Sequence, residues 1–190
     1  MNLEVKAPHI PSVKELYNYK LCVEKVYELI CQYQIQMQCC VSSFDRDVLK
    51  HLEHIANINN DKVQTIYLYN FYDHEALPDP SIYCTNGDGI NISSLHLTHE
   101  VVDNCRRYGK KVGVWIDKSY TKESKEVYRK VLSMGVDFFC TDYPELLIEE
   151  REIWMNEQGD ITYGESTGPM DDRMTIENVT NSNCSPIVLK

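Results

Sequence analysis

The sequence has no apolar run close to the roughly 20 residues that a membrane-spanning helix needs, so we expect no transmembrane segment. Residues 1–6 lack the apolar stretch of a secretory signal, and we expect a cytoplasmic protein. Positive charge is also scarce, because 19 Lys and Arg stand against 29 Asp and Glu, for a net charge of −10. An acidic surface repels nucleic acid, so we expect no nucleic-acid partner, and a phosphate-bearing substrate needs a local cation.

The eight cysteines include no Cys-x-x-Cys pair, and most of them lie within apolar runs such as Phe138-Phe139-Cys140. This pattern favours buried, reduced thiols over disulfides or a zinc site. The histidine pairs His51/His54 and His96/His99 lack a third and fourth ligand at the spacing of zinc sites. We therefore expect no zinc centre.

Short β-type runs alternate with helical periodicity from residue 3 to about residue 147. We expect strands at residues 3–6, 38–42, 63–69, 89–92, 111–116 and 136–141, and helices at 13–33, 45–56, 98–108, 121–134 and 144–154. Such alternation indicates βαβ units and an α/β fold with a parallel sheet. Because a (β/α)8 barrel usually needs about 250 residues, periodicity alone slightly favours an open doubly wound sheet.

The composition changes after Asn156. Residues 157–190 are rich in Gly, Asp, Glu, Asn, Ser and Thr and show no hydrophobic period. A segment this polar cannot bury enough apolar surface to fold alone. We expect an organised domain at residues 1–155 and a disordered acidic tail at residues 156–190.

Four segments, in order over about 145 residues, resemble the glycerophosphodiester phosphodiesterase family. Their sequences are NLEVKAP at 2–8, VSSFD at 41–45, GKKVGVW at 109–115 and GVDFFCTDYP at 135–144. The family is a (β/α)8 barrel with a TIM-barrel fold, and the segments match its third to eighth strands. The resemblance therefore implies an incomplete barrel and replaces the open-sheet expectation.

The resemblance implies metal-dependent hydrolysis of a glycerophosphodiester to glycerol 3-phosphate and an alcohol, in lipid and glycerol metabolism, with Mg²⁺ or Ca²⁺ as the ion. The family's His-Arg-Gly motif, its Glu-x-Asp metal pair and a further catalytic histidine have no counterpart in these 190 residues. We therefore expect the chain as given to be nearly inactive. Two alternatives stay open: a non-catalytic partial barrel that binds a partner or self-associates through open sheet edges, and a relative acting on a lysophospholipid or phosphoinositide.

Glu4 and Lys6 are two residues apart on a strand, so their side chains share one face. The resemblance implies that Glu4 is a metal ligand and that Lys6 is a catalytic cation, which neutralises a phosphate oxygen in the transition state. The plainer alternative is an ion pair on an edge strand. His9 lies near the expected mouth of the site but matches no histidine of the family.

Four further residues are candidate substrate ligands. Trp115 matches the tryptophan that packs against glycerol in the family, although a tryptophan in an apolar strand is also an ordinary core residue. Ser43 and Phe44 end the second strand, where Ser43 could instead cap the next helix. Asp117 shares the face of Trp115, so it could bind a substrate hydroxyl or repel the phosphate. Here the sequence differs from the family, because Ile116-Asp117-Lys118 replaces the usual T-V-N.

Overall fold

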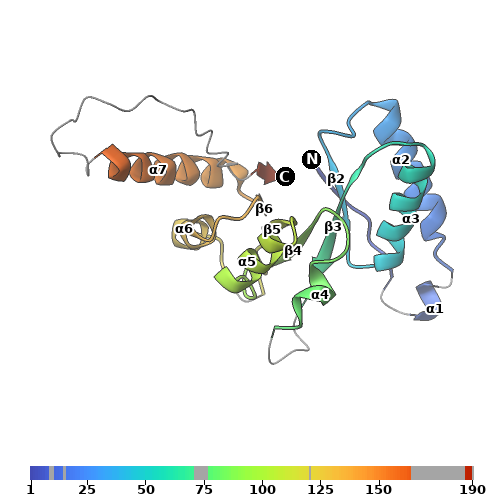
Figure 1. The fold of residues 1–190 in the computed structure, drawn as a ribbon, viewed down its shortest axis with the longest axis horizontal. Helices are drawn as coiled ribbons and strands as arrows, with labels where there is room; N and C mark the ends of the chain where they lie inside the picture. The colour runs from blue at the N-terminus through green and yellow to red at the C-terminus, as the bar shows by residue number, and fades with distance from the viewer. Residues whose placement is uncertain (9–10, 15, 71–76, 120, 164–186, 190) are drawn as a thin grey trace, which may run out of the picture.

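The computed structural model describes residues 1–8, 11–14, 16–70, 77–119, 121–163 and 187–189 (Figure 1). Its centre is a parallel sheet whose spatial order, β1 to β7, is also the chain order. The strands are β1 (Asn2–Glu4), β2 (Cys40–Ser43), β3 (Gln64–Tyr69), β4 (Gly89–Ser93), β5 (Lys111–Trp115), β6 (Phe138–Cys140) and β7 (Ile187–Leu189). The helices are α1 (Pro11–Lys14), α2 (Tyr19–Gln32), α3 (Arg46–Ile58), α4 (Pro80–Tyr83), α5 (His99–Arg107), α6 (Lys125–Ser133) and α7 (Pro144–Tyr163).

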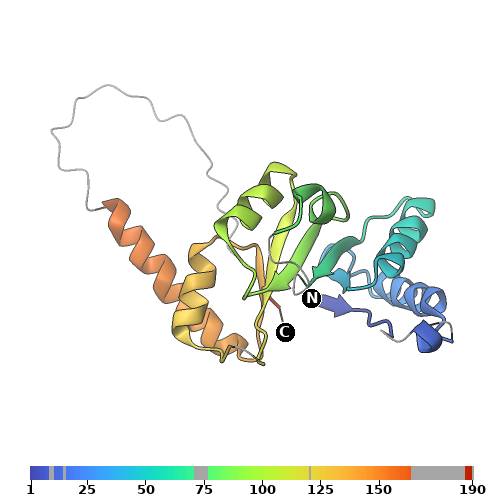
Figure 2. The ribbon, with the colours of Figure 1, turned by 90° about the horizontal axis from the view of Figure 1, so that it is seen from below.

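The sheet curls about its inner face. Cys40 on β2, Ile66 on β3 and Phe138 on β6 pack into one buried cluster, which requires strands from both ends of the sheet to face each other. Asn2 on β1 also reaches the Cys140 sulfur on β6. Figures 1 and 2 show the start of β1 close to β7 in both views. The curled parallel sheet confirms the predicted incomplete barrel and excludes an open doubly wound sheet.

The larger core lies between the outer face of the sheet and the helices. Alternate strand residues such as Val41, Ile90 and Val112 point outward and pack against apolar helix side chains such as Leu49 and Leu52. Helix α2 packs against α3 beside the first strands, and α6 packs against α7 beside the last strands (Figure 2). This division gives each strand an inner face that is available for a site and an outer face that carries stability.

Side-chain caps determine where α5 and α6 begin. Thr98 accepts a hydrogen bond from the Val101 amide at the start of α5, and Gly109, at φ +65°, follows its end. The predicted helix at 121–134 instead begins at Lys125, because Ser124 caps it.

The single helix predicted at residues 13–33 is wrong. The segment forms α1 and α2, because the Asn18 side chain accepts from the Leu21 amide and starts a new helix. Asp79 followed by Pro80 starts the short α4, which the sequence reading left irregular.

The C-terminal part differs from the sequence prediction in the length of the last helix and in one additional strand. Helix α7 continues past Trp154 to Tyr163, and residues 187–189 form β7, parallel to β6. Residues 164–186 and residue 190 lie outside the described part, so the disordered tail stays a prediction there. None of the described helices is both long and apolar enough to cross a membrane.

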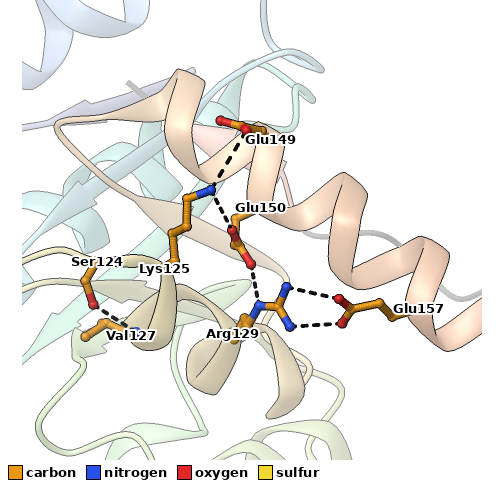
Figure 3. A network of polar contacts seen from close by, with 7 residues as sticks. All are labelled: Ser124, Lys125, Val127, Arg129, Glu149, Glu150 and Glu157. Carbon is orange, nitrogen blue, oxygen red and sulfur yellow. Dashed lines mark hydrogen bonds and ion pairs between the residues drawn. The ribbon is translucent and has the colours of Figure 1, made fainter.

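A buried carboxylate joins α6 to α7 (Figure 3). The Glu150 side chain on α7 is only 2% exposed, and it pairs with Arg129 and, at 3.5 Å, with Lys125 on α6. Arg129 also binds Glu157 through both terminal nitrogens, at 2.9 and 3.1 Å. The hydrogen bond from Arg129 lowers the pKa of Glu150 below its ordinary value. Because the folded state holds this carboxylate ionised, its contribution to stability exists above the unfolded pKa and disappears as the pH falls through the folded one.

We expect Glu150→Gln to lower the melting temperature by several degrees at pH 7, because it leaves the Arg129 and Lys125 charges without their buried partner. The difference from wild type should shrink as the pH falls through the folded pKa of Glu150. Thermal unfolding followed by circular dichroism at a series of pH values measures both effects. Glu152→Gln, an exposed change on the same helix, is the matched control; equal melting temperatures for the two variants at pH 7 would contradict the assignment.

Candidate functional site

A cleft of about 670 Å³ opens at the carboxyl ends of β1 and β2, the end of the sheet where sites form in this architecture. We call it the first cleft. It is lined by Glu4, Lys6, Ala7, Pro8, Phe44, Asp45, Arg46, Asp47 and Lys50. Glu4 and Lys6 are both exposed and both line it, as their shared face predicts. The sequence reading therefore placed this pair at a cleft, although their chemical roles stay predictions.

The first cleft gathers three cations in an otherwise acidic chain. Lys6 comes from the end of β1, whereas Arg46 and Lys50 lie four residues apart on α3 and share one face of that helix. Three carboxylates also line the cleft, but that of Asp45 accepts the Asp47 amide at 2.9 Å as the cap of α3. An anion that enters this cleft meets several positive side chains despite the net charge of −10.

A second cleft of about 430 Å³ adjoins the first at the ends of β2 and β3. Its lining residues are Phe44, Arg46, Tyr67, Leu68, Tyr69 and Asn70. Phe44 is 43% exposed and belongs to both clefts, which places this candidate substrate ligand in the wall between them.

Ser43 holds the two strands together at this end. Its buried hydroxyl donates to the Val5 carbonyl at 2.6 Å and accepts from the Asp45 amide at 3.1 Å. Asp45, and not Ser43, is the cap of α3. The hydroxyl is thus already committed to protein partners, and the arrangement gives Ser43 a positioning role beside Glu4 and Lys6.

Trp115 and Asp117 lie further round the rim. Trp115 is on the inner face of β5, partly exposed, and its buried indole Nε1 has no hydrogen-bond partner among the described residues. The Asp117 carboxylate accepts from the Ser119 amide at 2.9 Å, and its carbonyl accepts from Thr121, so Asp117 shapes the β5–α6 loop. Neither residue lines the two clefts described above.

Polar groups that the sequence reading missed face the inside of the curled sheet. Asn91 on β4 is 2% exposed, donates to the Cys140 sulfur at 3.5 Å, and has no described partner for its Oδ1. Ser42 on β2 is fully buried with its hydroxyl likewise unpartnered among the described residues. The alternation in Gly89-Ile90-Asn91-Ile92-Ser93 was the available signal, since it puts Asn91 and Ser93 on the face opposite the two isoleucines.

Burial disfavours the thiolate form of the inner-face cysteines Cys40 and Cys140. Burial raises the pKa of Cys40 to about 11, and burial also raises the pKa of Cys140. Both therefore stay protonated at neutral pH, whereas a reactive cysteine needs its thiolate. The seven described cysteines are all free, and Cys184 lies outside the described residues.

The fold matches those of solved phosphodiesterases. A protein of Galdieria sulphuraria assigned to the glycerophosphodiester phosphodiesterases superposes with a TM-score of 0.60 at 24% identity, covering 78% of this chain and 55% of that one. A similarly assigned protein of Silicibacter pomeroyi superposes with a TM-score of 0.63 at 21% identity, and the match covers 82% of this chain and 51% of that one. A glycerophosphodiester phosphodiesterase of Parabacteroides distasonis superposes with a TM-score of 0.59 at 19% identity, and the match covers 83% of this chain and 58% of that one. No protein-family model and no curated protein matches the sequence.

The chain has the fold of a partial glycerophosphodiester phosphodiesterase barrel. It spans between 51% and 58% of the length of these three structures. At these identities the likeness establishes the fold, and the first cleft lies at the carboxyl ends of the strands of this partial barrel.

The residues present do not make a metal site by themselves. No group of three or more His, Cys, Asp or Glu side chains in the described part of the chain could hold an ion. Glu4 is a suitable oxygen donor for Mg²⁺ or Ca²⁺, but those ions take six or more ligands. No histidine lines either cleft, and His9 lies outside the described residues. The described residues therefore supply charge and shape at this cleft.

The neighbouring serines of β2 give a matched test of how the site is held. We expect Ser43→Ala to cost about 1–2 kcal/mol of unfolding free energy, because it leaves the buried Val5 carbonyl and Asp45 amide without a partner. Ser42→Ala should be neutral or stabilising, since its buried hydroxyl makes no hydrogen bond to the residues that the structure describes. Urea denaturation measures the unfolding free energy of both variants and of wild type. An equal loss of stability in the two would show that Ser43 does not have this positioning role.

Proposed function

We propose that this chain binds a glycerophosphodiester at the first cleft and belongs, by function, with the phosphoric diester hydrolases that release glycerol 3-phosphate and an alcohol. The observation that carries the proposal is the position of Glu4 and Lys6. A carboxylate and an ammonium line the same cleft at the carboxyl end of β1, in a sheet with the fold of a glycerophosphodiester phosphodiesterase. Such an activity serves lipid and glycerol metabolism.

Lys6 is the phosphate-binding group in this proposal. Its ammonium is exposed at the cleft and can pair with a non-bridging oxygen, whose charge grows as the phosphorus–oxygen bond breaks. Trp115, on the inner face of β5, offers an apolar surface for glycerol, and Phe44 offers another in the wall between the clefts. Asp117 is the proposed partner of a substrate hydroxyl, on the rim of the same sheet.

The proposal does not give this chain a complete hydrolytic apparatus. Hydrolysis must protonate the departing alkoxide and activate water, work that commonly contributes a factor of about 10² to 10⁴. No imidazole lines the described clefts to do it. We therefore propose that the 190 residues bind substrate and product but turn substrate over very slowly.

Glu4 is proposed as one ligand of a Mg²⁺ or Ca²⁺ ion whose remaining ligands the described residues do not supply.

A cytoplasmic location stays part of the proposal. So does self-association, because β1 and β7 each pair with one neighbour in the described sheet, and a strand edge can pair with another chain.

We expect glycerol 3-phosphate to bind the full chain, and Lys6→Gln to weaken that binding roughly 10-fold, because the variant removes a charge-assisted hydrogen bond. Isothermal titration calorimetry measures both affinities. Lys130→Gln, an exposed change of the same kind on α6, should leave the affinity unchanged.

The same preparation should show no measurable release of glycerol 3-phosphate from glycerophosphocholine in the presence of Mg²⁺ or Ca²⁺. Turnover in the ordinary enzymatic range, roughly 1 per second or faster, would contradict the missing acid–base groups. Absence of any glycerol 3-phosphate binding would contradict the proposed function itself.

A further inference from the structure

The two clefts at the rim share a wall. Phe44 and Arg46 line both, so a phosphodiester held at Lys6 in the first cleft has the second cleft directly beside it. A phosphodiester carries two organic arms, and the second cleft can receive one of them. The chemistry of its lining therefore bears on which arm is accepted.

Among the described residues, the lining of the second cleft contains one cation and no carboxylate. Arg46, the first residue of α3, is its charged residue, and the others are aromatic, aliphatic or amide side chains. A positive charge with no opposing carboxylate in the same lining favours anionic or hydroxyl-rich groups and disfavours cations.

The position of the guanidinium is defined by an aromatic ring. The Arg46 guanidinium carbon lies 5.6 Å from the centre of the Tyr69 ring on β3, the geometry of a cation–π contact. The Tyr69 hydroxyl donates to the Ile82 carbonyl at 2.9 Å, which fixes the ring beneath it. Burial raises the pKa of Tyr69, and the nearby charge of Arg46 partly offsets that rise.

The same contact removes the usual way of binding a quaternary ammonium. Choline-type groups are recognised by the open faces of aromatic rings. Here the Tyr69 ring already carries Arg46, and Tyr67 is only 2% exposed. A trimethylammonium group in the second cleft would meet the Arg46 guanidinium, and of the described aromatic rings of the lining only that of Phe44, in the wall between the clefts, is substantially exposed.

We propose that Arg46 is a specificity residue that selects glycerophosphodiesters whose alcohol is anionic, such as a phosphorylated polyol, over those with a cationic alcohol such as choline. The inference rests on the proposed function, since it assumes that the phosphodiester lies at Lys6. Arg46 binds the second arm of the substrate, and the fork of its guanidinium suits a phosphate monoester or carboxylate.

Isothermal titration calorimetry of the full chain tests the proposal with three probes: glycerophosphocholine, glycerophosphoinositol and glycerophosphoinositol 4-phosphate. Affinity should rise in that order. In Arg46→Gln, the ratio of affinities for the phosphorylated and the choline compound should fall roughly 10-fold, the size expected for loss of one charge-assisted hydrogen bond. In Arg46→Lys the affinity ratio should fall less than in Arg46→Gln, because lysine keeps the positive charge but lacks the planar guanidinium that binds two oxygens at once.

Arg107→Gln is the matched control, because this exposed arginine lies in the last turn of α5, at the opposite end of the strands. It should leave all three affinities unchanged, and circular dichroism should show that each variant is folded. If glycerol 3-phosphate binds but the ratio is the same in wild type and Arg46→Gln, or if wild type prefers glycerophosphocholine, the role of Arg46 is wrong and the proposed function stands. If glycerol 3-phosphate and all three probes fail to bind, the proposed function is wrong and this inference is wrong with it.

Discussion

The curl of the sheet depends on the contact between Phe138 and Gly113. A side-chain carbon added at Gly113 would overlap the Phe138 ring, so the glycine on β5 leaves the space that this ring of β6 occupies. With the ring in that position, Phe138 meets Cys40 and Ile66 from the opposite side of the sheet. This small inner cluster brings the strands into a partial barrel, and the barrel brings the carboxyl ends of β1 and β2 to one rim.

The site at that rim is built by short-range connections. Ser43 ties the end of β1 to the end of β2, and Asp45 caps α3 immediately afterwards. This sequence of turns carries Phe44 and Arg46 into the walls of the clefts, next to the strand that bears Lys6. Three cations therefore gather beside three carboxylates in a chain of net charge −10, and a phosphate ligand finds local positive charge at Lys6, Arg46 and Lys50.

Much of the fold could be predicted from the sequence because its signals are local. Thr98 and Gly109 bound α5, and the alternating apolar residues of the strands gave their positions within a residue or two. The break between α1 and α2 was missed because helical periodicity continues through Asn18, whose capping bond competes with it. The pairing of β7 with β6 was missed because a three-residue strand within a polar segment has no period of its own.

The candidate site was predicted less completely, and for a different reason. The shared face of Glu4 and Lys6 follows from strand geometry, so their place at one cleft could be expected. Whether Arg46 and Lys50 face that cleft depends on how α3 lies across the strand ends, which no local pattern specifies. The partners of Ser43 were equally out of reach of the sequence: its hydroxyl donates to the Val5 carbonyl and accepts from the Asp45 amide, while its role as a substrate ligand stays a prediction.

The central claim is that the rim at the carboxyl ends of β1 and β2 binds a phosphate ester. The most direct measurement is a titration of the ¹⁵N-labelled full chain with glycerol 3-phosphate, followed by amide chemical shifts. We expect saturable shifts at Lys6, Ala7, Phe44 and Arg46, with no change at Asp88 or Lys110 near the opposite ends of the strands. Shifts confined to that opposite end, or none at all, would contradict it.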